Sequence, residues 1–369
     1  MPSADFITKC QAKTAKVRTV FNYATTDYSD SVISISPIQK DSELTSSYVT
    51  VKLDNAAGTF DDFIDDWTVL EESAYIAIEF TDLAEEHKLF TGTVESVEMG
   101  IDTITMTLKD KFARMLAKTI GDGVTPVIYQ GASQILANVV FDMLTTHGGL
   151  DDGLITNADI DLTSWAAWYN ELEDSGNEYR VSSYLTGQTI GWCLKKIKQL
   201  TNSYIFQGGD GKLYFYHYTD CPVGSIVYTK EYCIDRVYET TMDGVIHYVL
   251  CRYGLDTANG TWAGFEDGQL IVYTSAMDLI EEDMSIWHED ATSAARFVSE
   301  TLARLNPPIS TYTIQTPMAG FVSDIAKVET LSNHYDAPNN SIDITVEEIT
   351  YDVMNWETTI KASKLWSIS

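Results

Sequence analysis

The sequence predicts a mainly β protein with α-helical insertions, a fold of the α+β class. Short stretches in which apolar and polar residues alternate recur in both halves of the chain, and this alternation is typical of strands with one buried face. A few longer segments with helical periodicity lie between them. Because 369 residues exceed what one hydrophobic core usually serves, we also expect two or more domains.

Residues 1–120 are expected to form the first domain, an all-β unit that ends in a short helix. Residues 48–53 alternate Val, Val and Leu with Thr and Lys, and residues 54–58 then supply Asp, Asn and Gly for a turn. The predicted strands are 32–36, 48–53, 75–80, 89–94 and 101–108, and the predicted helix is 110–120.

Residues 121–186 are expected to be an inserted helical and irregular acidic segment. Ser133 is placed to cap a helix whose apolar positions recur with a 3.6-residue period from Ile135 to Leu144. The stretch from Gly148 to Arg180 is acidic and contains Trp165 and Trp168, but it has no clear period. The role of residues 148–180 is not indicated by their composition.

Residues 187–290 are expected to contain a central helix, an aromatic hairpin and further strands. The helix covers about 188–201, and the hairpin joins residues 204–206 to 212–218 through the Gly/Asp turn 208–211. Further strands are predicted near 226–228, 245–253 and 270–273.

Residues 291–369 are expected to close the chain with a helix and a second set of strands. The helix covers about 292–305 and stops before Pro307 and Pro308. The predicted strands are 311–315, 325–329, 342–351 and 356–362.

A faint internal repeat links the two ends of the chain. The segment from Val94 to Lys109 aligns without a gap on the segment from Val346 to Lys361, and each reads as a strand, a turn and a strand. One interpretation is that each hairpin closes one of two related β-domains. The other is that any two amphipathic hairpins align this well.

The charge balance disfavours nucleic acid as a bound ligand. The chain has 54 acidic and 24 basic residues, for a net charge of -30, whereas proteins bind duplex DNA mainly through Lys and Arg. One interpretation is simple solubility or a saline habitat, and another is a surface that DNA approaches without sticking. Charge alone does not separate them.

The remaining composition points to a protein made in a reducing cytoplasm. The five cysteines are scattered and form no CxxC pair, which excludes the usual zinc ribbon and thioredoxin-like motifs. No apolar run approaches the roughly 20 residues that a membrane span needs, so no membrane insertion is expected. The first residues lack the basic and apolar regions of a secretory signal.

Residue patterns that would carry chemistry are not found, so no enzyme is expected: we assign no catalytic, cofactor-binding or metal-ligating residue and no cofactor. The sequence has no HExxH, GxSxG or GxxxxGK[ST] motif. Residues 208–212 look superficially phosphate-binding, but they join two strands, so we expect a plain turn. The acidic residues 61–66 lack the ligand spacing of a calcium loop. The six histidines are isolated in the sequence.

The best enzyme candidate is the Trp165–Asp174 region. Exposed tryptophans could stack on sugars, and Glu171, Glu173 and Asp174 could supply an acid and a base for glycoside cleavage. Adjacent carboxylates in one segment rarely reach the separation that glycosidases need. A carbohydrate-binding or glycoside-cleaving protein is therefore kept as an alternative.

Four stretches together resemble the tail-hub proteins of tailed bacteriophages. Residues 49–60, with a Leu-Asp-Asn turn, resemble the family's early strand, and residues 89–92 with 105–110 resemble its next hairpin and helix. The helix from Gln188 and the hairpin to Phe215 are similar to its central elements, and residues 294–361 to its closing helix and barrel. The segment 148–180 has no counterpart in the family pattern.

The resemblance implies two tube-like split β-barrel domains per subunit and a homotrimer. It implies a structural hub between a six-fold tail tube or distal tail protein above and a three-fold spike or tip protein below, with a tape measure protein as a further partner. DNA would pass without specific binding. The implied location is the tail tip of a virion assembled in a bacterial cytoplasm. The hub of a phage-tail-like contractile injection system is a further alternative.

Overall fold

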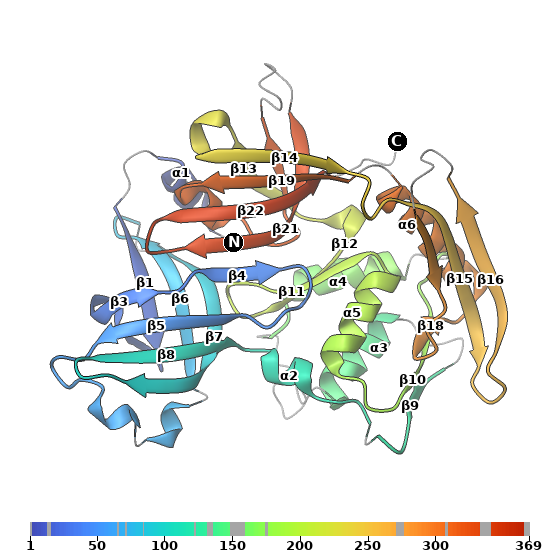
Figure 1. Cartoon of the computed structure of the whole chain (residues 1–369), viewed down its shortest axis with the longest axis horizontal. Helices are drawn as coiled ribbons and strands as arrows, with labels where there is room; N and C mark the ends of the chain where they lie inside the picture. Colours follow the sequence, from blue (N-terminus) through green and yellow to red (C-terminus); the bar gives the residue numbers. More distant parts are fainter. Residues whose placement is uncertain are drawn as a thin grey trace.

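The computed structural model is mainly β with helical insertions, as the sequence predicted (Figure 1). It describes residues 2–364 except 13–15, 65, 71, 84, 122, 131–135, 148–158, 174–175, 271–276, 307–308 and 333–340. The strands are grouped into two seven-stranded sheets, one six-stranded sheet and a separate hairpin.

The first seven-stranded sheet uses residues 17–110, and we call it the first β-module. Its strand order is β2 (Thr26–Asp27), β1 (Val17–Tyr23), β6 (Ser73–Phe80), β7 (Glu85–Met99), β8 (Thr103–Asp110), β5 (Tyr48–Asp54) and β3 (Val32–Ile35). The alternation in β5 buries Val49, Val51 and Leu53 completely and leaves the residues between them exposed. The period-two prediction for this strand is confirmed.

The second seven-stranded sheet is assembled from distant parts of the chain, and we call it the second β-module. Its order is β13 (Val223–Tyr228), β20 (Val328–Leu331), β21 (Ile342–Asp352), β22 (Glu357–Lys364), β19 (Ile309–Thr316) and β14 (Asp235–Thr241). A strand from the N-terminal part of the chain, β4 (Ile38–Asp41), also pairs with β21. Residues 38–41 therefore complete a sheet whose other strands come after residue 222.

The two modules share one strand order. Apart from β2 in the first module and β4 in the second, which have no counterpart, the first runs β3–β5–β8–β7–β6–β1 and the second runs β14–β19–β22–β21–β20–β13. The six remaining strands of equivalent rank in the chain are therefore neighbours in both modules. One pairing differs, because β1 is antiparallel to β6 whereas β13 is parallel to β20. The faint sequence repeat is thus part of a larger structural repeat.

The repeated hairpins also carry a β-bulge at the same place. The pairing shifts between Val94 and Ser96 in one hairpin and between Val346 and Glu348 in the other. Past the turn the sequence alignment is wrong by two residues, because Val94 faces Leu108 while Val346 faces Ala362 rather than Ile360. The second hairpin has the longer turn, which shifts the pairing by two residues. Because side chains alternate between faces with a period of two, this shift leaves each side chain on the same face of the sheet.

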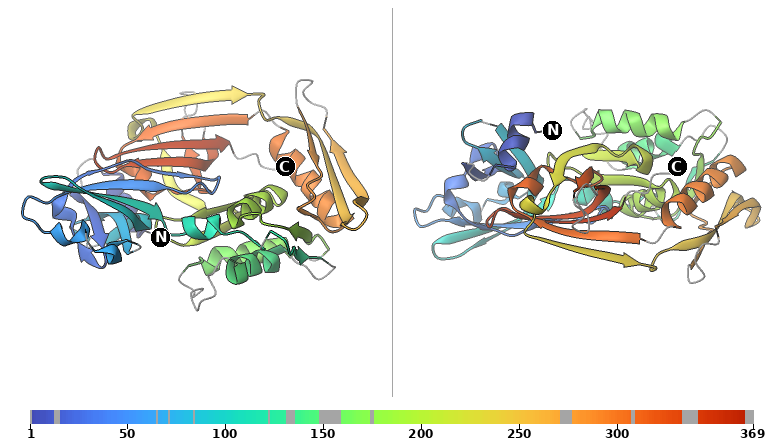
Figure 2. Two further views of the ribbon diagram at one scale, coloured as in Figure 1. Left: turned by 60° about the horizontal axis from the view of Figure 1, so that its bottom comes forward. Right: turned by 90° about the horizontal axis from the view of Figure 1, so that it is seen from above.

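A third region, which we call the lateral domain, contains most of the helices. Figures 1 and 2 place it at the opposite end of the molecule from the first module. Its strands are β9 (Val127–Tyr129), β10 (Val181–Leu185), β15 (Ile246–Asp256), β16 (Thr261–Gln269), β17 (Met277–Glu281) and β18 (Ile286–His288). Its helices are α2 (Ala113–Ala117), α3 (Leu136–Asp142) with a π-helical turn (Met143–His147), α4 (Leu162–Leu172), α5 (Ile190–Leu200) and α6 (Ala291–Leu305).

The aromatic hairpin separates two hydrophobic cores. It consists of β11 (Ser203–Gln207) and β12 (Leu213–His217), as predicted. Tyr204 and Phe206 pack into the core shared by the two modules, whereas Ile205 and Phe215 pack into the core of the lateral domain. Because successive side chains point to opposite faces, a hairpin buried on both sides needs apolar residues at nearly every position.

Several sequence predictions need correction. The segment 148–180 is not wholly irregular, because α4 lies within it and is capped by Asp161, whose side chain accepts from the Ser164 amide at 2.8 Å. The strands β1, β4 and β14 and the N-terminal helix α1 (Ala4–Cys10) were not predicted. The predicted strand 270–273 falls mostly outside the described residues, and so do Ser133 and Ile135.

The predicted domain boundaries at residues 120, 186 and 290 remain a proposal. The pairing shows that residues 223–241 share a sheet with residues 309–364. Helix α6 contacts β15 and β16 of the lateral domain. In the described part of the chain, no helix is both long and apolar enough to span a membrane.

Candidate functional site

The turn of the aromatic hairpin is a packing element rather than a phosphate loop. It joins β11 to β12, and Gly211 has a φ of +80°, as the turn requires. The Thr91 hydroxyl of the first module donates to the Gly209 carbonyl at 2.8 Å, and Gln207 Nε2 donates to the Thr91 carbonyl at 2.8 Å. A Cβ at Gly209 would lie 2.2 Å from the Lys88 carbonyl oxygen, so only glycine allows this approach. The turn fixes the hairpin to β7.

The Leu-Asp-Asn turn after β5 is also structural. Asn55 Oδ1 accepts from the Phe60 amide at 2.8 Å, and Asn55 Nδ2 donates to Asp61 at 2.9 Å. Phe60 is fully buried beneath this turn. The first carboxylate of the acidic stretch 61–66 is therefore used to hold a loop.

The tryptophans of the Trp165–Asp174 region do not form an exposed sugar platform. Trp168 is 1 % exposed, and its indole N–H donates to the Ser203 hydroxyl at 2.8 Å. Trp165 is half-buried and meets Phe215 edge to face, with ring centres 4.9 Å apart. The expectation of exposed tryptophans is wrong, because α4 turns both rings toward the aromatic hairpin.

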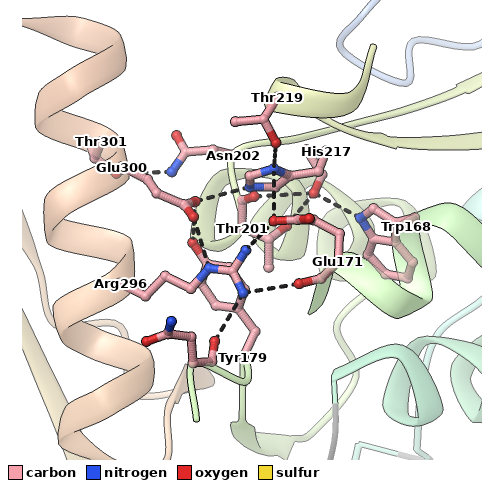
Figure 3. Close-up of polar contacts among 12 residues, drawn as sticks. Trp168, Glu171, Tyr179, Thr201, Asn202, His217, Thr219, Arg296, Glu300 and Thr301 are labelled. Atoms are coloured by element: carbon pink, nitrogen blue, oxygen red, sulfur yellow. Dashed lines mark hydrogen bonds and ion pairs between the residues drawn. The ribbon is translucent and has the colours of Figure 1, made fainter. Parts of the chain in front are cut away.

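Of the carboxylates near these tryptophans, Glu171 belongs to a partly buried polar cluster (Figure 3), whereas Glu173 interacts with Tyr169. Arg296 Nε donates to Glu300 at 2.8 Å, and Arg296 Nη2 donates to Glu171 at 2.7 Å. Glu300 Oε2 also accepts from Tyr179 Oη at 2.7 Å and lies 3.0 Å from His217 Nε2. Figure 3 shows these side chains converging from α4, β12 and α6.

The electrostatics of the cluster favour the charged form of Glu300. Burial alone would raise the pKa of Glu300, but the hydrogen bonds and charges of His217 and Arg296, with the Tyr179 hydroxyl, outweigh it, so the pKa is lowered. Burial and Glu300 together raise the pKa of the Tyr179 phenol. Two carboxylates on one guanidinium are arranged to join helices, not to face each other across a substrate. Asp174 lies outside the described residues.

Two of the histidines, His87 and His288, have pKa values lowered by burial. Burial lowers the pKa of His288 to about 3, and its Nδ1 lies 2.6 Å from the Ser293 hydroxyl. Burial, helped by Lys327, lowers the pKa of His87 to about 4. Among the described residues no group of three or more His, Cys, Asp or Glu is placed to hold a metal ion. His334 lies outside those residues. The assignment of no catalytic, cofactor or metal residue remains a prediction.

Two exposed edge strands occupy equivalent positions in the modules. In each module the strand next to β5 or β19 lies at an edge of its sheet, namely β3 in the first and β14 in the second. Ile33 on β3 is 45 % exposed, and Val237 on β14 is 54 % exposed. Unpaired backbone groups beside exposed apolar residues are suited to pairing with another chain. The sequence did not indicate that these two side chains lie on exposed sheet edges, because the strands are short or mixed in polarity.

Comparison with solved structures gives the fold a clear assignment. The 43 kDa tail protein of prophage MuSo2 from Shewanella oneidensis matches with a TM-score of 0.58 at 13 % identity, over 94 % of this chain and 98 % of that one. The tail protein from Neisseria meningitidis MC58 matches with a TM-score of 0.59 at 10 % identity, over 94 % and 96 %. The chain has the fold of phage tail proteins.

This tail-protein fold extends to further structures. Prophage tail protein gp18 from Listeria monocytogenes matches with a TM-score of 0.53 at 8 % identity, over 94 % of each chain. A chain of the Francisella PdpA–VgrG complex matches with a TM-score of 0.51 at 9 % identity, over 97 % of this chain and 59 % of that one. No profile of a known protein family and no curated protein sequence matches. The resemblance to tail hubs is confirmed at the level of the fold.

Proposed function

We propose that this protein is the structural hub of a phage tail, a homotrimer that joins a six-fold tail tube to a three-fold spike or tip. The observation that carries the proposal is the presence of two β-modules of matching strand order in one chain. Three copies then present six similar modules, while the lateral domains retain three-fold symmetry. A closed ring of this kind satisfies both symmetries.

The modules would join into a ring through their edges. The equivalent strands β3 and β14 carry exposed Ile33 and Val237, so similar contacts are available to both modules. Pairing at these edges would remove exposed apolar area and satisfy backbone groups in the same step. The lateral domain would then lie outside the contact between modules.

The partners follow from this geometry. The ring would contact a tail tube or distal tail protein on one face and a spike or tip protein on the other, and a tape measure protein could occupy its channel. DNA would pass without specific binding, since a chain with net charge -30 repels phosphates over most of its surface. The site of action would be the tail tip of the virion, after assembly in the host cytoplasm, and no reaction would be catalysed.

The oligomeric state tests the proposal. Mass photometry of the purified chain is expected to show a species of three times 41.2 kDa. Val237→Asp places a charge on the β14 edge and should shift the population to monomer. Ile101→Asp is a matched control, because Ile101 is 98 % exposed in the turn between β7 and β8. A wild-type protein that stays monomeric at all concentrations would contradict the proposal.

A second candidate is the hub of a phage-tail-like contractile injection system. The match to a chain of the PdpA–VgrG complex favours it, since that chain shares this fold. The two candidates differ in what the assembled particle contains. Nuclease-protected DNA in purified particles that contain this chain supports the phage hub, whereas particles of the same architecture without DNA support the injection system.

A further inference from the structure

A cavity of 290 Å³ lies where the aromatic hairpin, the end of α6 and the second β-module meet. Its lining includes Tyr204, Tyr218, Arg304, Thr345, Glu347 and Lys364. These residues come from β11, β21 and β22, from the segment after β12 and from the last turn of α6. The polar cluster of Figure 3 does not share a residue with this lining.

Two buried hydroxyl groups in the lining have no hydrogen-bond partner among the described residues. Tyr218 is 8 % exposed and Thr345 is 1 % exposed, yet neither Tyr218 Oη nor Thr345 Oγ1 is paired. A buried polar group that lacks a partner destabilises the folded state. Most buried hydroxyls in proteins are paired, so two unpaired ones in one cavity indicate a site for an acceptor.

The guanidinium of Arg304 is the main charge in the lining. It lies over the ring of Tyr204, with Cζ 5.5 Å from the ring centre. Glu347 acts on it electrostatically but does not reach ion-pair distance among the described residues. Glu347 lines the same cavity, but its Oε1 accepts from Tyr204 Oη at 2.7 Å and from Ser363 Oγ at 3.0 Å. Arg304 thus places a cation in the lining of this cavity, in a chain whose net charge is -30.

We propose that this cavity binds a carboxylate group. The planar guanidinium of Arg304 matches the two oxygens of a carboxylate, and the hydroxyls of Tyr218 and Thr345 supply further donors. The volume is at the lower limit of ligand pockets, which fits one acidic side chain or a small dicarboxylic acid. The carboxylate comes either from an acidic segment of a polypeptide or from a free acid. The inference goes beyond the hub function and does not depend on it.

Isothermal titration of the full chain tests the site with two probes. Glutarate represents the free acid, and the capped peptide acetyl-Gly-Glu-Gly-amide represents an acidic side chain, each at constant ionic strength. Tighter binding of the peptide assigns the site to a polypeptide partner, and tighter binding of glutarate assigns it to a free acid. Either result supports a carboxylate site.

Variants decide whether Arg304 and the unpaired hydroxyl carry the binding. Arg304→Gln should weaken the better probe at least about tenfold, since a charge-assisted hydrogen bond is lost. Thr345→Val keeps the side-chain shape and should weaken it several-fold. Arg252→Gln is the control, because Arg252 is exposed and pairs with Glu282 at 3.1 Å, and it should bind like the wild type.

Three results would overturn the proposal. The first is that neither probe binds. The second is that Arg304→Gln and Arg252→Gln bind the better probe with equal affinity, and that Thr345→Val, which does not alter the charge, binds it as tightly as the wild type. The third is inorganic phosphate binding as tightly as the better probe, which would indicate a general anion effect.

Discussion

The two β-modules share a strand order but differ in how the chain supplies their strands. The first module uses only residues 17–110, whereas the second uses β4, residues 223–241 and residues 309–364. The bulged hairpin is common to both. The comparison indicates that hairpin register and edge pairing define the module, and that long insertions between its strands are tolerated because they leave this pairing intact.

Equivalent core positions show the same principle at the level of side chains. In the first module Val49 pairs with Leu108, and at the equivalent place in the second module Tyr312 pairs with Ala362. All four are buried. In the second module a large residue faces a small one, whereas in the first module two residues of medium size face each other. Both pairs fill a similar volume, so the packing is kept although the amino acids differ.

The comparison is broken most strongly by removing a fully buried aromatic side chain next to each module, Phe60 after β5 and Phe321 between β19 and β20. Phe60→Ala and Phe321→Ala should each lower the free energy of unfolding by about 3–5 kcal/mol, because both rings are fully buried. Both belong to one core that spans the two modules, so either change should destabilise both modules together. Urea unfolding followed by amide exchange measures this.

The exchange pattern is the decisive reading of that experiment. Loss of protection in β7 and β21 at the same urea concentration agrees with a shared core. If Phe60→Ala exposes the β7 amides to exchange while the β21 amides stay protected, the two modules unfold as independent units.

The strand β4 is expected to hold the first and second modules together. Ile38 on β4 is fully buried and pairs with Tyr351, so Ile38→Ala should cost about 2–5 kcal/mol. Ile33→Ala on the exposed edge strand β3 is the matched control, with an expected cost below about 1 kcal/mol in the monomer. Chemical denaturation of both variants compares them, and equal costs would show that β4 contributes no more than an edge strand.

Acid should weaken the first module through His87, whereas the strands of the second module contain no histidine. Burial lowers the pKa of His87 from 6.5 to about 4, so below pH 6.5 the unfolded chain binds the proton more readily. The stabilisation is complete above pH 6.5 and is lost as the pH falls toward 4. Between pH 7.5 and pH 5 we expect a loss of roughly 2 kcal/mol.

The variant His87→Gln separates this effect from other titrations. The free energy of unfolding, measured by urea at both pH values, should change less in the variant than in the wild type. The same dependence on pH in both proteins would show that His87 titrates normally in the folded chain.

The smallest expected effect concerns the surface ion pairs of the two hairpins. Lys109 pairs with Glu95 at 3.1 Å, and Lys361 pairs with Glu348 at 2.7 Å, both next to the bulge. Double-mutant cycles should give coupling energies of about 0.2–1 kcal/mol for each pair, falling with added salt. A coupling far above this range in one hairpin would show that the modules differ in how the bulge is held.

The parts of the fold that were predictable depend on local patterns. The hairpin β11–β12 was predictable because a Gly/Asp turn separates two aromatic runs, and β5 was predictable from its strict alternation. The helix α4 was missed although Asp161 provides a cap signal, because Trp165 and Tyr169 blur its apolar face. The strand β4 was missed because its partner, β21, lies some 300 residues away and only folding brings them together.

The candidate sites show the same division. The turn at residues 208–211 was predictable from sequence, whereas the burial of Trp168 was not, because it depends on contact between α4 and the hairpin. The cavity next to Arg304 gathers residues from five separate segments, so no spacing in the sequence could indicate it.

Electron cryomicroscopy of the purified oligomer tests the central claim most directly. We expect a ring of three chains whose β-module layer has near six-fold symmetry, with first and second modules alternating, while the lateral domains keep three-fold symmetry. A ring built from only one of the two modules, or an isolated monomer under all conditions, would contradict it.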